Sequence, residues 1–185
     1  MLFRSATNSR AQNAFEQWER RGQDKTLAFC VSKRHADFMT EFFSNKGVRS
    51  VAVHSGPGSA PRTQSLVQLQ NGELQVVFAV DMFNEGVDVP EIDTVMMLRP
   101  TESKILWLQQ LGRGLRIAND SSYLVVIDYI GNHRTFLQAP MVLLPGAGTR
   151  PGEISRALEA LQRGDLELPR GCEVEYELEA LNILR

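Results

Sequence analysis

The chain has 185 residues, 43% of them hydrophobic, and a formal net charge of −2. This hydrophobic content can form a buried core, and the near-neutral charge excludes a globally basic nucleic-acid binder, so any nucleic-acid surface has to be local. The two cysteines, Cys30 and Cys172, are too few and too far apart for a disulfide framework or a zinc site. We expect Cys30 to be a buried small hydrophobic side chain, and we expect no bound metal. Since no apolar run reaches the roughly 18 residues of a membrane span, we also expect a cytoplasmic location without a membrane partner.

The first 22 residues have a helical pattern in which Phe15 and Trp18 are the expected docking side chains. Five short apolar segments follow, and the lack of polar alternation in several of them is typical of strands that are buried on both faces. Helical patterns lie between them, and this alternation predicts an α/β fold with a mainly parallel sheet. The expected strands are 26–31, 49–54, 74–80, 94–98 and 123–128, and the expected helices are 33–45, 61–70 and 103–116.

After Pro140 the character of the sequence changes. Residues 145–152 are rich in proline and glycine and resemble a linker, and residues 154–163 are expected to form a short helix. These shifts predict three parts: residues 1–22 as an N-terminal helix or linker, residues 23–140 as the α/β domain, and residues 141–185 as a C-terminal extension.

The connection of residues 80–90 is largely polar and leaves the carboxyl end of an expected strand. Ligands of open parallel sheets bind at the carboxyl ends of strands, so this connection is a candidate site loop. The alternative is a plain connection between a strand and a helix.

Residues 107–116, WLQQLGRGLR, combine glutamine, glycine and two arginines on one expected helix. At helical spacing Gln109, Arg113 and Arg116 lie within about 60° of one another, whereas the leucines of the segment fall on another face. Arginine presents a rigid fork of N–H donors that suits phosphate. The segment therefore indicates a phosphate-facing pair of arginines, with a solvated helix face as the alternative.

Four segments together resemble the second RecA-like domain of superfamily 2 helicases and translocases, over residues 26–138. The sequences of residues 109–116 and 128–134 are most similar to those of restriction-enzyme translocases and DNA-repair helicases. The resemblance implies a three-layer parallel-sheet domain of the P-loop NTPase type that lacks its own phosphate-binding loop. The matching segments are residues 26–32 (motif IV), His54-Ser55-Gly56 followed by Arg62, residues 80–90 (motif V), and Gln109, Gly112, Arg113 and Arg116 (motif VI).

In this family ATP, with Mg²⁺, binds in a cleft between two RecA-like domains. No G-x-x-x-x-G-K-[ST] sequence occurs in the chain, so the resemblance implies the second domain only, inactive by itself and dependent on a first RecA-like domain of the same parent chain. It also implies that Arg113 and Arg116 are arginine fingers, that Gln109 lies near the γ-phosphate or its attacking water, and that Gly112 belongs to the nucleotide site.

In the motif V segment, Gly86 would let the backbone approach the nucleotide, and Asp88 would accept a hydrogen bond from the ribose or from an arginine of the cleft. At the start of this loop the family often has a threonine followed by an aspartate, and the threonine hydroxyl can contact a nucleic-acid phosphate. Val80 stands there instead, which removes one expected contact with the strand.

The resemblance places a nucleic-acid surface, for DNA rather than RNA, at the rim formed by the end of the motif IV strand, the His54–Arg62 element and motif V. A solvated surface role remains the alternative for Lys33 and Arg62. For His54 a local hydrogen-bonding role is favoured over a metal-ligand role, because no second ligand is spaced nearby. A non-enzymatic nucleic-acid-binding or regulatory module is the second interpretation of the whole chain, whereas an unrelated nucleotide-binding domain would need a glycine-rich loop after the first strand. The expected nucleic-acid contacts are Ser32, Lys33, His54, Ser55, Gly56 and Arg62.

Overall fold

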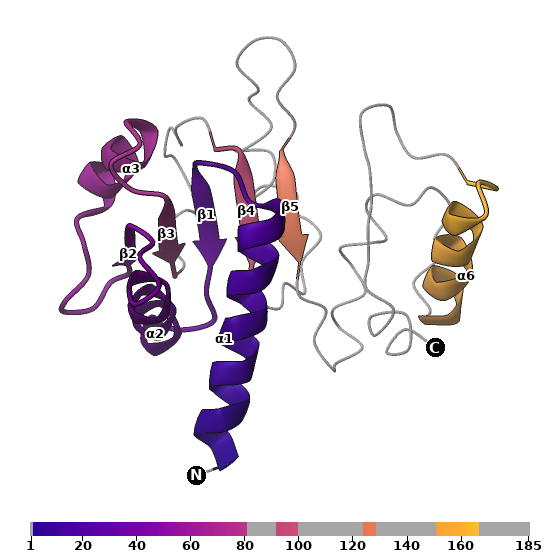
Figure 1. Ribbon diagram of the computed structural model, residues 1–185, viewed down its shortest axis with the longest axis horizontal. Coiled ribbons are helices and arrows are strands. Elements are labelled where there is room, and N and C mark those ends of the chain that lie inside the picture. The colour runs from indigo at the N-terminus through magenta and orange to yellow at the C-terminus, as the bar shows by residue number, and fades with distance from the viewer. Residues whose placement is uncertain (1, 81–91, 100–123, 129–150, 167–185) are drawn as a thin grey trace. The chain divides into compact units, whose positions relative to one another are not determined.

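The computed structural model describes residues 2–80, 92–99, 124–128 and 151–166 (Figure 1). Their strands form a five-stranded sheet of order β2-β3-β1-β4-β5 in which every neighbouring pair is parallel. This confirms the predicted α/β fold, and each observed strand lies inside an expected one. The strands are β1 (Thr26–Phe29), β2 (Ser50–Val53), β3 (Val76–Ala79), β4 (Thr94–Met97) and β5 (Val125–Asp128).

The helices also follow the sequence pattern, with shifts at their ends. Pro61 is the N-cap of its helix rather than a residue of the first turn. The helix expected at 154–163 begins earlier, at Pro151, whose fixed φ suits a first helical turn. The expected helix 103–116 lies outside the described residues. The helices are α1 (Leu2–Arg21), α2 (Lys33–Ser44), α3 (Arg62–Gln70) and α6 (Pro151–Gln162), and α6 belongs to a separate compact unit.

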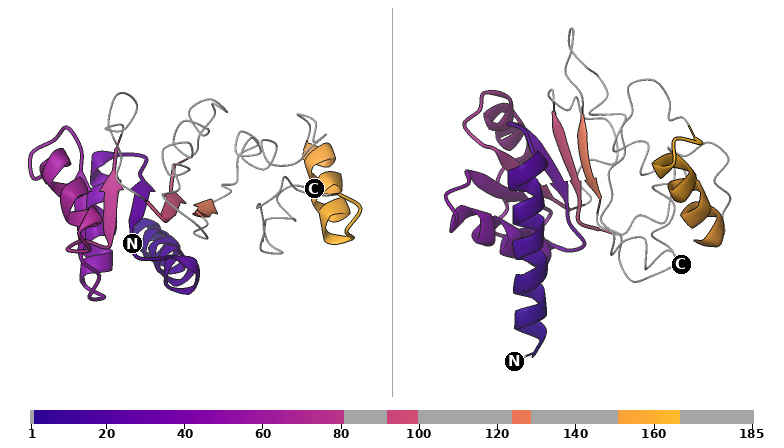
Figure 2. Two further views of the ribbon diagram at one scale, coloured as in Figure 1. Left: turned by 90° about the horizontal axis from the view of Figure 1, so that it is seen from above. Right: turned by 45° about the vertical axis from the view of Figure 1, so that its right-hand side comes forward.

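Helices cover both faces of the sheet. The chain crosses from β1 to β2 in one direction and returns from β2 to β3 in the other, so right-handed crossovers place α2 and α3 on opposite faces. Helix α1 shares the face of α2 and runs in front of the sheet, continuing past its edge (Figures 1 and 2). Among the described helices none is long and apolar enough to span a membrane.

An aromatic cluster joins α1, α2 and the centre of the sheet. Phe43 is fully buried, and its ring lies 5.2 Å from Phe15, 5.5 Å from Trp18 and 5.0 Å from Phe78, centroid to centroid. Edge-to-face and tilted geometries such as these are the favoured arrangements of aromatic rings. Phe15 and Trp18 therefore dock α1, as predicted.

The amino edge of the sheet is closed by the connection between α1 and β1. The Asp93 carboxylate accepts hydrogen bonds from the backbone N–H groups of Asp24 (3.1 Å) and Lys25 (2.9 Å). The Trp18 indole N–H donates to the Thr26 hydroxyl at 2.8 Å. At Gly22 a Cβ would lie 2.6 Å from the Trp18 carbonyl oxygen, so only glycine fits this turn. These contacts fix α1 to the start of β1.

We expect Phe43→Ala to lower the free energy of unfolding by about 3–5 kcal/mol, because the substitution leaves a cavity that the surrounding rings cannot fill. The matched control is Val67→Ala, which truncates a side chain on α3 that is 50% exposed and is expected to change stability by less than about 0.5 kcal/mol. Urea unfolding measures both variants. Similar small losses for both would contradict the central place of Phe43.

Candidate functional site

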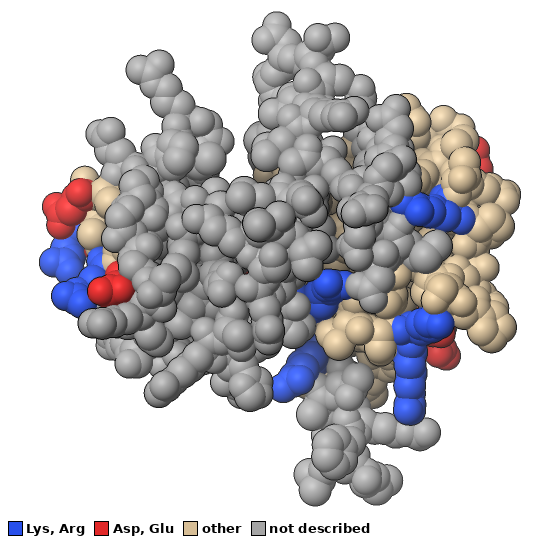
Figure 3. All heavy atoms as spheres, turned by 180° about the vertical axis from the view of Figure 1, so that it is seen from behind, with Lys and Arg blue, Asp and Glu red and all other residues tan. Residues whose placement is uncertain are grey.

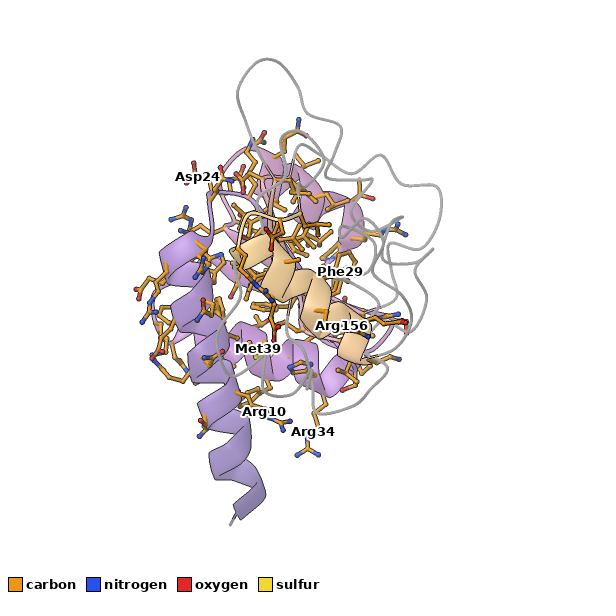
Figure 4. All side chains as sticks on the ribbon, turned by 90° about the vertical axis from the view of Figure 1, so that its right-hand side faces the viewer. Arg10, Asp24, Phe29, Arg34, Met39 and Arg156 are labelled. Carbon is orange, nitrogen blue, oxygen red and sulfur yellow. The ribbon has the colours of Figure 1, made fainter. Side chains whose placement is uncertain are left out.

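The carboxyl edge of the sheet gathers the connections that leave β1 and β2. Because all strands are parallel, residues 30–32 and residues 54–60 (the 54–60 loop) emerge on the same edge. Figure 4 shows Arg34, at the start of α2, pointing out beyond this edge, while Asp24 lies at the opposite edge. In open parallel sheets this is the edge at which ligands bind.

The connection from β1 to α2 is a capped helix start with exposed polar side chains. Ser32 is the N-cap, and its hydroxyl oxygen accepts a hydrogen bond from the His35 backbone N–H at 3.2 Å. The Val31 backbone N–H donates to His35 Nδ1 at 3.3 Å, and partial burial lowers the pKa of His35. Ser32 and Lys33 are exposed, so both are available to a ligand at this edge.

Cys30 ends the buried part of this connection. It is 0% exposed, and burial raises the pKa of its thiol, which keeps the thiol protonated. The predicted role as a small hydrophobic side chain is confirmed.

The 54–60 loop is built around a buried histidine. His54 is 4% exposed, and both of its ring nitrogens have partners. Nδ1 accepts a hydrogen bond from the Gly56 backbone N–H at 3.0 Å, and Nε2 lies 2.8 Å from an Asp37 carboxylate oxygen. His54 therefore has the local hydrogen-bonding role that the sequence favoured for it. Within the described part of the chain no group of His, Cys, Asp and Glu side chains is arranged to hold a metal ion.

Lys33 and Gly56 bring the two connections into contact. A Cβ built on Gly56 would lie 3.1 Å from His54 Nδ1 and 3.2 Å from Lys33 Cδ, so the aliphatic part of Lys33 lies against the glycine. Glycine at position 56 thus permits the loop to pass closely beneath the lysine side chain. Lys33 as a whole is exposed, so its charged end is accessible to solvent.

The structure brings most of the expected nucleic-acid contacts to one edge. Ser32, Lys33 and Ser55 are exposed, Gly56 is half-buried, and Arg62 is half-buried in the first turn of α3 rather than fully solvated. Asp37 was missed in the sequence analysis, because nothing in the linear sequence signals a partner 17 positions before His54. The expected nucleotide-site residues lie outside the described residues: Gly86, Asp88, Gln109, Gly112, Arg113 and Arg116.

Figure 3 shows the described Lys and Arg side chains of one side as separate groups, with a few acidic side chains near them. This agrees with the net charge of −2. The chain as a whole therefore has no excess of positive charge to attract a polyanion.

Comparison with known proteins identifies the class of domain. The family model described as "Helicase conserved C-terminal domain" matches residues 9–118, which is more than half of the chain. The chain therefore belongs to the family of helicase conserved C-terminal domains.

Individual relatives agree with this assignment. The chain is 35% identical over 106 residues to IRC3 of Saccharomyces cerevisiae, which is named as an ATP-dependent helicase, covering 57% of this chain and 15% of that protein. It is 31% identical over 109 residues to UvrABC system protein B of Synechococcus elongatus, covering 56% of this chain and 16% of that protein. The matched regions thus span about a sixth of the length of these relatives.

Solved structures show the same fold. The C-terminal domain of the DEAD-box protein Dbp5 superposes with a TM-score of 0.60 at 14% identity, covering 85% of this chain and 79% of that one. The RNA-helicase Prp28 of Chaetomium thermophilum superposes with a TM-score of 0.55 at 25% identity, covering 68% of this chain and 31% of that one. These similarities confirm the RecA-like architecture that the sequence motifs predicted.

The lowered pKa of His35 predicts a pH dependence of stability. Below about pH 6.5 the unfolded chain binds a proton at His35 that the folded chain does not, so stability falls as the pH drops through this range. His35→Asn retains an acceptor for the Val31 N–H and does not titrate. Between about pH 7.5 and about pH 5.5, we expect urea unfolding to show a larger loss of stability for the native chain than for the variant. Equal losses would show that His35 does not contribute.

Proposed function

We propose that the chain is the second motor domain of an ATP-dependent nucleic-acid helicase or translocase, with its carboxyl edge holding part of a single strand. The observation that carries the proposal is the contact between the two connections at this edge, where Lys33 lies against the Gly56 backbone that His54 holds. The family assignment and the RecA-like fold support the same conclusion.

The described residues fit a nucleic-acid backbone rather than a base-reading surface. The Ser32 hydroxyl accepts the helix-capping hydrogen bond, which leaves its own hydrogen to donate to a phosphate oxygen. Lys33 supplies a positive charge, and Ser55, which precedes Gly56 in the chain, supplies an exposed hydroxyl. Hydroxyls, backbone N–H groups and single cations bind phosphates without reading sequence.

For the polymer we propose DNA. The support is the sequence of residues 109–116 and 128–134, which resembles that of restriction translocases and DNA-repair helicases. RNA is the competing outcome, since one structural neighbour at 25% identity carries the name RNA-helicase. Matched single strands of DNA and RNA separate the two in one binding experiment.

For the nucleotide we propose ATP with Mg²⁺, held mainly by a first RecA-like domain. In this arrangement Arg113 and Arg116 would point across the cleft at the γ-phosphate, with Gln109 and Gly112 beside them and Gly86 and Asp88 in the neighbouring loop. ATP supplies the phosphoryl group whose transfer spreads negative charge over its oxygens, and arginine forks stabilise that charge.

The finger role predicts a large and specific loss of turnover. In a protein that contains this chain and a first RecA-like domain with its phosphate-binding loop, we expect Arg113→Ala to lower DNA-stimulated ATP hydrolysis by about 10³–10⁵-fold. Arg113→Lys keeps the charge but loses the fork, so it should not restore the rate.

Arg163→Ala is the control for that experiment, because Arg163 is an exposed arginine of the separate unit. Its described ion pair, with Glu159, has an N–O distance of 3.5 Å. It should leave turnover unchanged. Undiminished turnover in Arg113→Ala would overturn the finger role. Absence of ATP hydrolysis in the unaltered protein, together with retained DNA binding, would favour the non-enzymatic binding module.

The nucleic-acid edge predicts a change in salt dependence. Each lysine that neutralises a phosphate of a single strand contributes about 0.7 to the slope of log affinity against log salt, so we expect Lys33→Ala to lower the slope by about that amount. Lys25→Ala, at the amino edge, is the matched control and should leave the slope unchanged. Fluorescence anisotropy with a labelled oligothymidylate measures both, and equal slopes in the two variants would contradict the proposal.

A further inference from the structure

Asp37 is the contact that links the buried His54 to helix α2. His54 has a side chain only 2% exposed, and its Nε2 atom lies 2.8 Å from Asp37 Oδ1. The Asp37 side chain is 55% exposed and belongs to the second turn of α2. Although the two residues are 17 positions apart, the fold brings α2 against β2 so that they meet.

The hydrogen bonds of the ring define one tautomer. A backbone N–H can only donate, so the Gly56 N–H requires a lone pair on His54 Nδ1. In the neutral ring the proton is then on Nε2, which donates to the Asp37 carboxylate. Asp37 thereby favours the form of the imidazole that can hold Gly56.

The ring in turn organises the 54–60 loop. The His54 backbone N–H donates to the Ser59 hydroxyl at 2.8 Å, and the Ala60 N–H donates to the Ala52 carbonyl at 2.9 Å, which closes the loop against β2. Gly56 lies against both the His54 ring and the Lys33 stem. A rotation of the ring would therefore move the Gly56 backbone and the base of Lys33 together.

We propose that Asp37 is a positioning residue for nucleic-acid binding: through His54 it holds the 54–60 loop and Lys33 in the arrangement that meets the phosphates of the strand. Asp37 itself does not contact the strand. The inference rests on the proposed function of this edge, and it adds a residue to that site which none of the sequence motifs includes.

The sign of the effect separates positioning from simple electrostatics. A carboxylate near a phosphate-binding surface repels the ligand, so its removal alone would strengthen binding. If Asp37 acts through His54, its removal weakens binding instead, because the loop loses the partner that fixes its central ring.

The test compares three variants of the full chain by fluorescence anisotropy with a labelled oligothymidylate. Asp37→Leu removes the acceptor and is expected to weaken affinity about tenfold, as for the loss of one charge-assisted hydrogen bond. Asp37→Asn removes the charge but keeps an acceptor oxygen, and is expected to stay within about twofold of the unaltered chain. Glu41→Leu, one turn further along the same helix and exposed, removes an equal charge and should bind no more weakly than the unaltered chain.

Nitrogen NMR of the histidine ring supplies a readout that does not depend on the ligand. We expect the His54 ring to carry its proton on Nε2 in the unaltered chain and in Asp37→Asn, and the Gly56 amide signal to shift in Asp37→Leu. Asp37→Leu could also lower the thermal unfolding midpoint. Its NMR spectrum then shows whether the folded chain has lost the His54–Gly56 contact, with Asp37→Asn, which keeps an acceptor, as the reference.

The outcomes distinguish the inference from the function on which it rests. If the unaltered chain fails to bind the oligonucleotide, the proposed function is overturned. If the unaltered chain binds and Asp37→Leu has an equal or higher affinity, which is the result expected for Glu41→Leu, the positioning role alone is overturned. A ring proton on Nδ1 in the unaltered chain would also overturn it.

Discussion

The common direction of the five strands is the constraint on which the site depends. Because β1 to β5 are parallel, all five strands end at the same edge, where the described connections after β1 and β2 begin, and all five start at the opposite edge. The amino edge is fixed by Asp93 and the turn at Gly22, which are structural contacts. The carboxyl edge instead presents exposed Ser32, Lys33 and Ser55 on a rigid base, as a binding site requires.

A buried imidazole connects this base to its surroundings. A polar group that is removed from water has to be hydrogen-bonded, and His54 meets this requirement with the Gly56 N–H on one side and Asp37 on the other. The same two bonds that satisfy the ring also fix the 54–60 loop. The two hydrogen bonds of the His54 ring therefore both satisfy a buried polar group and set the arrangement of the proposed phosphate contacts.

The sequence predicted those parts of the fold that depend on local pattern. Apolar runs located all five strands, and helical spacing located α2 and the docking residues of α1, because burial imposes these patterns on neighbouring residues. The Asp93 and Asp37 contacts were not predictable in this way, since their partners are about 70 and 17 positions distant. The motif order predicted the family correctly, whereas the roles of Arg113 and Arg116 remain predictions.

Amide hydrogen exchange with and without an oligothymidylate is the most direct test of the proposed nucleic-acid edge. The account predicts that the single strand slows exchange in residues 31–35 and in the 54–60 loop, while residues 22–25 and 71–75 at the amino edge exchange at an unchanged rate. Slowed exchange at the amino edge, or no change at either edge, would contradict it.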